Sequence, residues 1–204
     1  FTANASLAIS TPTFATDVSD YVLATAWSPD GYYLAVGGIH HDNFIKVYKL
    51  VNGSFSAIAE PIFSGTYAFN GVIAIDWSPD GRYLAVGGIG SSYNLRIFRF
   101  DGSAFTLLVS TSSNGYVRTV QWSPDGNYLA AGGDNFALIY QFDGQSISTL
   151  LNFTYDDSVF ALAWSPDGKY LAIGGGSESL HAGVYPMCFG RQTSSQAASS
   201  SIIL

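Results

Sequence analysis

A motif of 13 residues occurs four times in this chain, and the copies align without gaps. Each copy reads x-Trp-Ser-Pro-Asp-Gly-x-Tyr-Leu-Ala-x-Gly-Gly, and the copies occupy residues 26–38, 76–88, 121–133 and 163–175. They contain every tryptophan of the chain, at intervals of 50, 45 and 42 residues: Trp27, Trp77, Trp122 and Trp164. A period of roughly 40–50 residues is typical of units of four β-strands and is longer than the roughly 20–34 residues of solenoid repeats. The sequence therefore predicts four similar β-units in a row.

Each unit is expected to contain four strands, named a to d here. Strand a ends at the tryptophan, and strand b is the Tyr-Leu-Ala-x-Gly-Gly segment. Runs of apolar and β-branched residues predict strands c and d in the first three units, at residues 44–50 and 55–62, 95–100 and 105–110, and 137–142 and 147–153. The corners between them are Asn-Gly or Asp-Gly, the preferred two-residue hairpin turns. Because the chain has only two Glu and three Lys, strong helix formers are scarce.

The residues of the motif have structural roles in this prediction. Pro presets φ for a tight turn after strand a, Asp bonds its own backbone, and Gly accepts a positive φ. Because the four aspartates recur identically, we expect them to form turns rather than a catalytic site. The tryptophans are expected to be buried between neighbouring units. The turn residues in question are Asp30, Gly31, Asp80, Gly81, Asp125, Gly126, Asp167 and Gly168.

These repeats resemble the WD40 family of β-propellers over about residues 5–187, and the Trp-Ser-Pro-Asp-Gly corner is also similar to TolB-type propeller repeats. The resemblance implies an all-β, WD40-like propeller with four blades of four antiparallel strands in this chain. The Trp-Asp pair that ends strand c in the family is replaced by Tyr-Lys, Phe-Arg and Tyr-Gln. An N-terminal strand d at about 6–14 is expected to complete the last blade. The blade cores are expected at about 21–63, 72–110, 117–153 and 159–187, followed by a Ser-rich tail at 188–204.

The residues show no pattern for catalysis, a metal or a cofactor. His40 and His41 are adjacent and have no partner motif, so an exposed loop is favoured over a metal site. A net charge of -7, with 8 Lys and Arg against 15 Asp and Glu, argues against binding of nucleic acid. No apolar run reaches the roughly 20 residues of a membrane span, so no membrane insertion is expected. We therefore expect a protein that needs no cofactor and is not an enzyme.

The loops that differ between units are the best candidates for binding. In a WD40-like propeller the a–b and c–d turns lie on one face, and the d–a and b–c loops lie on the other. The first set is uniform here and the second is variable, and function concentrates on loops held by a rigid scaffold. The alternative is that these loops differ only because their sequences are not constrained. The candidate binding residues are His40, His41, Tyr67, Phe69, Tyr93, Tyr116, Phe136 and Tyr155.

The expected function is a non-catalytic scaffold for protein–protein or surface interaction, whose partner is another protein or further copies of the chain. The alternative is a self-assembling structural subunit of an extracellular filament or oligomer, joined through blade edges or the N-terminal strand. A start at Phe1 rather than Met and three sequons suggest a secreted or cell-surface protein. The candidate glycosylation sites are Asn4, Asn52 and Asn152.

Four blades are few for a family whose rings usually have seven or eight. Three arrangements remain open: part of a longer propeller, associated copies (an eight-bladed dimer or an open stack), or a self-closed ring of four blades. An open set of blades leaves the Trp-bearing face of a terminal blade exposed, and such an apolar surface calls for a partner. An incomplete blade also leaves a strand edge unpaired. We therefore expect the isolated chain not to be a well-behaved monomer.

Overall fold

The computed structural model describes residues 21–39, 45–59, 71–89, 94–113, 115–176 and 182–187. This part of the chain contains fifteen β-strands and no helix. The strands form four sheets in which sequence neighbours pair in an antiparallel manner. The predicted all-β fold built from propeller blades is confirmed.

Each sheet is one blade, and its strands a to d follow in sequence order. Blade 1 contains β1 (Tyr21–Trp27), β2 (Tyr33–Ile39), β3 (Ile45–Val51) and β4 (Ser54–Ala59). Blade 2 contains β5 (Gly71–Trp77), β6 (Tyr83–Ile89), β7 (Leu95–Phe100) and β8 (Phe105–Thr111). Blade 3 contains β9 (Val117–Trp122), β10 (Tyr128–Gly133), β11 (Phe136–Phe142) and β12 (Ile147–Thr154). Blade 4 contains β13 (Val159–Trp164), β14 (Tyr170–Gly175) and β15 (Ala182–Pro186), and the strand d expected for it at 6–14 lies outside the described residues.

The Ser-Pro-Asp-Gly turns have the same geometry in all four blades. In blade 2 the Ser78 hydroxyl donates to Asp80 Oδ1 at 2.6 Å and accepts the backbone N–H of Tyr83 at 2.9 Å. The same carboxylate oxygen accepts the N–H of Arg82 at 3.0 Å. The turn glycines have φ between 70° and 75°, which only glycine adopts without strain: Gly31, Gly81, Gly126 and Gly168. Each repeated aspartate thus accepts hydrogen bonds within its own turn.

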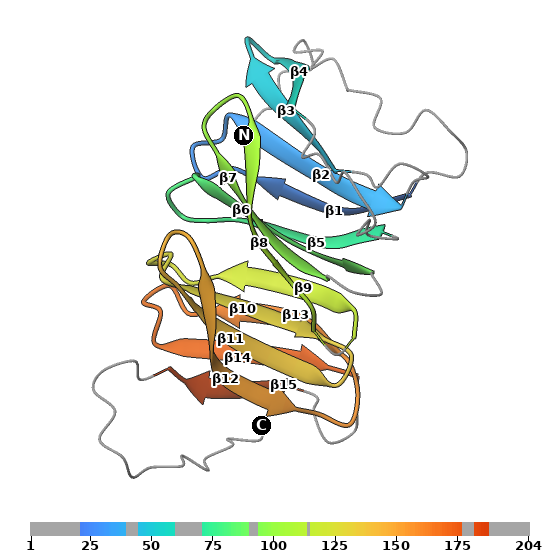
Figure 1. Cartoon of the computed structure of the whole chain (residues 1–204), viewed down its shortest axis with the longest axis vertical. Helices are drawn as coiled ribbons and strands as arrows, with labels where there is room; N and C mark the ends of the chain where they lie inside the picture. The colour runs from blue at the N-terminus through green and yellow to red at the C-terminus, as the bar shows by residue number, and fades with distance from the viewer. Residues whose placement is uncertain are drawn as a thin grey trace, which may run out of the picture.

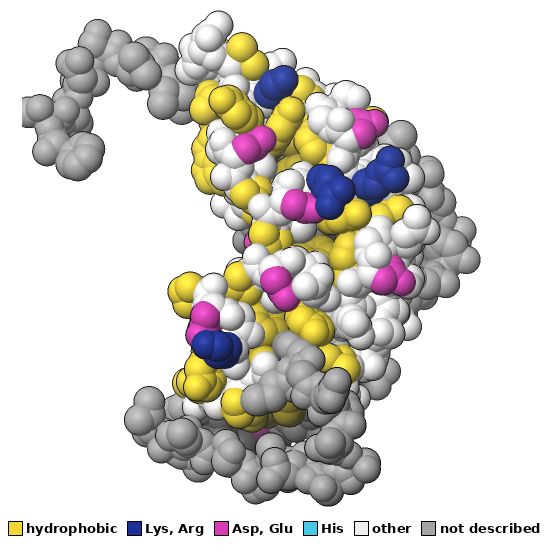
Figure 2. All heavy atoms as spheres, turned by 90° about the vertical axis from the view of Figure 1, so that its left-hand side faces the viewer, with side chains coloured by type: hydrophobic (Ala, Val, Ile, Leu, Met, Phe, Trp, Pro, Cys, Tyr) yellow, Lys and Arg dark blue, Asp and Glu magenta, His cyan; other side chains and the backbone are white. Residues whose placement is uncertain are grey.

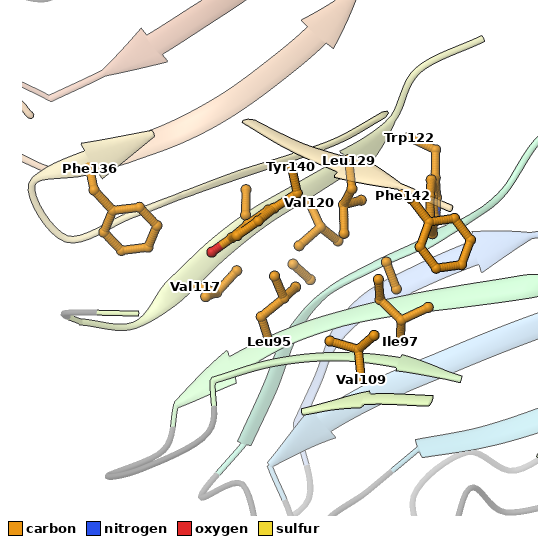
Figure 3. Packing of buried hydrophobic residues seen from close by; sticks show 13 residues of the cluster. Leu95, Ile97, Val109, Val117, Val120, Trp122, Leu129, Phe136, Tyr140 and Phe142 are labelled. Carbon is orange, nitrogen blue, oxygen red and sulfur yellow. The ribbon is translucent and has the colours of Figure 1, made fainter. Parts of the chain in front are cut away.

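Neighbouring blades pack face to face with an unchanging polarity, and Figure 3 shows the packing between blades 2 and 3. The face that carries the tryptophan in one blade covers the face of the preceding blade that carries the tyrosine of strand b. Between blades 2 and 3, for example, Trp122, Leu129 and Val120 pack against Leu95 and Ile97. Full burial of each such aliphatic side chain contributes about 1.5–3 kcal/mol. These three interfaces form the hydrophobic core of the arc of blades.

Glycines in strand b allow the close approach of the next blade. A Cβ atom at Gly37 would lie 2.4 Å from Val72 Cγ1, and one at Gly87 would lie 2.5 Å from Val117 Cγ1. Gly132 has the same relation to Val159. Contacts this short are not found for real side chains, so the first glycine of each pair is required by packing.

The prediction that every repeated tryptophan is buried is wrong for Trp27, and Trp164 is only partly buried. Trp77 and Trp122 are 4% exposed, whereas Trp27 is 49% exposed. All three have the same local sequence, but Trp77 and Trp122 are each covered by a preceding blade and Trp27 is in the first one. The tryptophan face of blade 1 is thus exposed at Trp27 and Val22, whereas Val36 and Tyr48 on the same face are buried.

The blades are arranged in an arc, with β1–β4 at one end of the longest axis and β13–β15 at the other (Figure 1). β1 runs to the left in this view and β2 to the right, so the Ser-Pro-Asp-Gly turns lie on the left side. Figure 2 shows that side, where acidic and a few basic side chains are spread along the arc among apolar ones. Among the described residues, no helix is long and apolar enough to cross a membrane.

Candidate functional site

Five of the eight candidate binding residues lie outside the described residues: His40, His41, Tyr67, Phe69 and Tyr93. The structure describes the other three, Tyr116, Phe136 and Tyr155. It places them in three different environments, so they do not form one surface together.

Phe136 does not belong to an exposed loop. The connection between β10 and β11 is a two-residue turn, Asp134-Asn135, in which Asn135 has a φ of 67°. Phe136 is therefore the first residue of β11, and its side chain is 6% exposed in the core between blades 2 and 3 (Figure 3). The assignment of Phe136 to a binding loop is corrected on this ground, because the sequence suggests a longer loop than the hairpin that forms.

Tyr155 is half-buried against blade 4. Its hydroxyl lies 3.4 Å from that of Tyr185, and both rings pack around the hydrophobic cluster of blades 3 and 4. Burial, with a smaller contribution from the Tyr185 hydroxyl, raises the pKa of Tyr155 far above its usual range. This side chain mainly contributes to packing between the two blades.

Tyr116 is 40% exposed and lies next to two residues that the loop argument did not include. The guanidinium carbon of Arg118 is 5.7 Å from the Tyr116 ring centroid and 5.5 Å from that of Phe160. Phe160 is 56% exposed. We call Tyr116, Arg118 and Phe160 the arginine–aromatic cluster; it joins blade 3 to blade 4 at the start of strand a.

A β-bulge in strand a explains why Arg118 and Phe160 converge. The pairing of β9 with β10 skips Arg118, and the pairing of β13 with β14 skips Phe160. The same position is skipped in the first two blades, at Leu23 and Ile73. A bulge leaves one residue out of the ladder and re-aims its side chain.

The four bulge residues, Leu23, Ile73, Arg118 and Phe160, are called the bulge row. They occupy equivalent positions on strands that lie beside one another from blade to blade, β1 with β5, β5 with β9, and β9 with β13. Leu23 is 47% exposed, and Ile73 and Arg118 are partly exposed. The row therefore presents apolar, aromatic and guanidinium groups along the inner strands of the arc.

Asp134 holds Arg118 in place. Its Oδ1 accepts a hydrogen bond from Arg118 Nε at 2.7 Å and one from the Ser158 hydroxyl at 3.2 Å, and its Oδ2 accepts the Tyr116 N–H at 3.2 Å. Partial burial alone would raise the pKa of Asp134, but these hydrogen bonds and the Arg118 charge lower it overall. The cluster is therefore fixed by an ion pair before any partner arrives.

On the opposite face, a shallow groove of about 440 Å³ runs between the turns of blades 2 and 3. Asp80, Asp125 and Asp143 line it together with Tyr83 and Phe142. Asp80 pairs with Arg82 at 2.7 Å, and Asp125 accepts the Asn127 amide at 2.8 Å. Across the described residues, no three His, Cys, Asp or Glu side chains are grouped so that they could hold a metal ion.

Asp76 is a partly buried acid between blades 2 and 3. Its Oδ2 accepts the Trp122 backbone N–H at 2.7 Å. Burial raises the pKa of Asp76 to about 6, although hydrogen bonds from Trp122 and Gln121 act in the opposite direction. Its carboxylate has a structural partner, so we assign it to the interface between the blades.

Comparisons with known proteins agree with this architecture. The solved structures that resemble the chain include one titled "Crystal Structure of Mitotic Checkpoint Complex", at 21% identity and a TM-score of 0.62, covering 81% of this chain and 49% of that one. Another is PpgL, a periplasmic gluconolactonase of Pseudomonas aeruginosa, at 17% identity and a TM-score of 0.61, covering 79% and 52%. The chain thus spans about half the length of these two proteins, and the likeness concerns the fold. No curated protein sequence matches it significantly.

The sequence profile described as "WD domain, G-beta repeat" matches four segments, residues 11–49, 61–99, 105–141 and 144–181. These segments cover most of the chain, and each includes one Trp-Ser-Pro-Asp-Gly motif. The repeated motif, the blades and this match agree. The chain belongs to the WD40 repeat family.

Proposed function

We propose that this protein is a non-catalytic scaffold that binds a protein partner through the bulge row and Tyr116. The observation that carries the proposal is the arginine–aromatic cluster, in which Arg118 is held between two exposed rings by Asp134. Aromatic residues and Arg are enriched among the residues that dominate binding energy in protein interfaces. The partner we expect therefore offers apolar or aromatic side chains to Phe160 and Tyr116.

Preorganisation supports this assignment. Immobilising a flexible side chain on binding costs about 0.5–1.5 kcal/mol, and this cost is small where the side chain is already fixed. Arg118 is fixed by its bond to Asp134, and the bulge residues are carried by strands rather than by loops. A partner can therefore bind to the cluster without first ordering it.

The chemistry of the cluster favours binding over catalysis. A general acid or base works best with a pKa near the operating pH, whereas that of Asp134 is lowered by Arg118 and by backbone and hydroxyl donors. A fold similar to that of a gluconolactonase does not bring an activity with it, because one fold supports many functions.

The proposal is tested by comparing two double variants in a pull-down. Tyr116→Ala/Phe160→Ala removes both rings of the cluster. The control, Tyr32→Ala/Leu107→Ala, removes an aromatic and an aliphatic side chain that are 59% and 47% exposed elsewhere. We expect the wild type and the control to capture a protein that the cluster variant does not capture. The proposal is supported when this protein, once purified, binds the cluster variant at least tenfold more weakly than the wild type. Equal binding to all three forms contradicts it.

A secreted or cell-surface location is the second part of the proposal. Asn52 lies at an exposed hairpin corner, and Asn152 is exposed on β12. Both positions leave room for a glycan on the surface of the blade. The chain should be expressed through a eukaryotic secretory pathway and treated with peptide N-glycosidase. A mass decrease that disappears in Asn52→Gln/Asn152→Gln supports glycosylation, and an unchanged mass of the wild type contradicts it.

A further inference from the structure

The three interfaces between blades share their glycine contacts, and two of them also share an indole hydrogen bond. The Trp77 indole N–H donates to the Ala26 carbonyl of the preceding blade at 3.2 Å, and the Trp164 indole donates to the Gln121 carbonyl at 3.1 Å. Each acceptor is the residue before the tryptophan of the preceding blade. The indole contact thus joins blades 1 and 2 and blades 3 and 4, whereas between blades 2 and 3 the Trp122 indole N–H is buried without a hydrogen-bond partner among the described residues.

The Ser-Pro-Asp-Gly turns also contact the preceding blade. A Cβ at Gly81 would lie 3.8 Å from Pro29 Cδ, and one at Gly126 would lie 3.5 Å from Pro79 Cδ. The Gly168 turn packs on Pro124 in the same manner. Each turn glycine therefore faces the proline of the preceding turn.

Two tyrosine hydroxyls of strand b contact the following blade instead. Tyr33 of blade 1 donates to the Gly102 carbonyl of blade 2 at 3.4 Å, and Tyr83 of blade 2 donates to the Gly144 carbonyl of blade 3 at 3.3 Å. Both acceptors are glycines of the c–d turn in the following blade. A complete interface therefore joins a tryptophan face and a tyrosine face through the strands and through both sets of turns.

Blade 1 carries an unused tryptophan face. Trp27 is 49% and Val22 is 41% exposed, whereas the equivalents of Val22, which are Val72, Val117 and Val159, are 0% exposed. No described atom lies within 4 Å of a Cβ at Gly31. Val36 and Tyr48 on the same face are already buried, so the open part is the region of β1 and its turn.

Blade 4 carries the unused counterpart. Tyr170 is 48% and Val184 is 44% exposed, and Ala163 and Pro166 are exposed beside them. These residues are equivalent to Tyr33, Val47, Ala26 and Pro29, which receive blade 2 on the face of blade 1 that lies inside the arc. The two ends of the chain are thus the two halves of one interface.

We propose that blade 1 of one copy docks on blade 4 of a second copy, so that two chains close an eight-bladed ring. The Trp27 indole then donates to the Ala163 carbonyl of the second copy, and Gly31 receives Pro166. Val22 packs on Gly174, and the Tyr170 hydroxyl reaches the Gly53 carbonyl. A second copy is the occupant we assign because each end matches the other end of the same chain, in continuity with the three interfaces inside it.

The ring, rather than a filament, follows from symmetry and length. A head-to-tail interface produces a closed ring when its rotations close and an open fibre when they do not, and closed rings prevail among soluble oligomers. The two solved propellers that resemble this chain are each about twice the length that it covers.

A disulfide across the proposed interface provides a sharp test. At the three internal equivalents, the Cβ position of the glycine lies 3.0 or 3.1 Å from the valine Cβ. This is slightly below the range of about 3.5–4.5 Å in disulfides, so a small shift permits the bond. Val22→Cys/Gly174→Cys should be prepared in a Cys188→Ser background, which removes the single native thiol.

Oxidation of this double variant should yield one covalent species with twice the 21.7 kDa mass of the chain on a denaturing gel. Each single-cysteine variant should remain uncrosslinked, because position 22 faces position 174 and not itself. An internal disulfide in a monomer would overturn the proposal in favour of a four-bladed ring. A ladder of multimers would overturn it in favour of an open stack, and absence of any cross-link would overturn it entirely.

A second test needs no cross-link. Sedimentation of the wild type should give a dimer that dissociates on dilution, and Val22→Arg should weaken it at least tenfold. Leu107→Arg is the matched control, since Leu107 is 47% exposed on β8, away from both ends of the arc. Circular dichroism confirms that each variant is folded. A wild type that is monomeric at all concentrations, or equal dissociation of both variants, would overturn the proposal.

Discussion

The repeated tryptophans allow the strongest quantitative prediction, because two of them share a local sequence and differ in surroundings. Trp77 is 4% exposed, donates to the Ala26 carbonyl, and packs with ring centroids 5.5 Å from Phe100 and 6.0 Å from Phe105. Trp27 is 49% exposed and has Phe55 at 5.8 Å. Truncation to alanine should therefore have unequal effects.

Trp77→Ala is expected to lower the free energy of unfolding by about 3–5 kcal/mol, since the transfer and cavity contributions apply in full. Trp27→Ala should lower it by about 1–2 kcal/mol at dilutions where the chain is monomeric, because roughly half of the indole already contacts water. At high protein concentration, where the proposed ring forms, the effect of Trp27→Ala should become larger.

Urea unfolding followed by far-ultraviolet circular dichroism measures both losses, and it does not depend on the fluorescence that the substitutions remove. The wild type and both variants should be compared at two protein concentrations. A loss below about 1 kcal/mol for Trp77→Ala, or equal losses for the two variants, would refute the claim that blade packing buries the repeated tryptophan. A concentration-independent effect of Trp27→Ala would speak against the ring.

Three further predictions concern a partly buried acid, the repeated turn and the N-terminal segment. Burial raises the pKa of Asp76 from 3.8 to about 6, so its ionisation destabilises the folded state and stability should fall as the pH rises from about 4 through 6. Asp76→Asn should remove about 3 kcal/mol of this dependence in urea titrations at several pH values, and an unchanged difference between pH 4 and 8 would contradict it. Gly81→Val, at a φ of 70°, should destabilise by about 1–2 kcal/mol and by more than Asp80→Asn, as thermal melts will show; the reverse order, or loss of a bound ion in Asp80→Asn, would argue for a ligand site. Deletion of residues 1–16, which include the strand expected to complete blade 4, should increase aggregation in light scattering, and a compact monomer unaffected by the deletion would contradict that expectation.

The repeated turn is the part of the structure that sequence reasoning described best. Ser, Asp and Gly of the motif interact with atoms no more than five residues away, as in the bonds of Ser78 to Asp80 and Tyr83. Such contacts depend on local residue types alone, so they recur wherever the motif does. The spacing of the motif then predicted the number of blades.

The candidate site was predicted only in part. Tyr116 was a candidate because it lies in a variable loop, whereas Arg118 was not a candidate although it is the one basic residue of the four a strands. Phe160 has no sequence signal, because its exposure results from a bulge that exists only once β13 pairs with β14. Phe136 was placed on a loop because the sequence does not show that two residues suffice to connect β10 and β11.

Sequence alone determined the elements that depend on neighbours along the chain: the strands, the tight turns with positive φ, and the repeat that multiplies them. Tertiary structure decided which side chains meet water, because burial depends on what lies across the interface. Trp27 and Trp77 occupy the same place in the same motif, yet one is half exposed and the other is covered. The difference is a preceding blade, which covers Trp77 and which the described residues do not supply for Trp27.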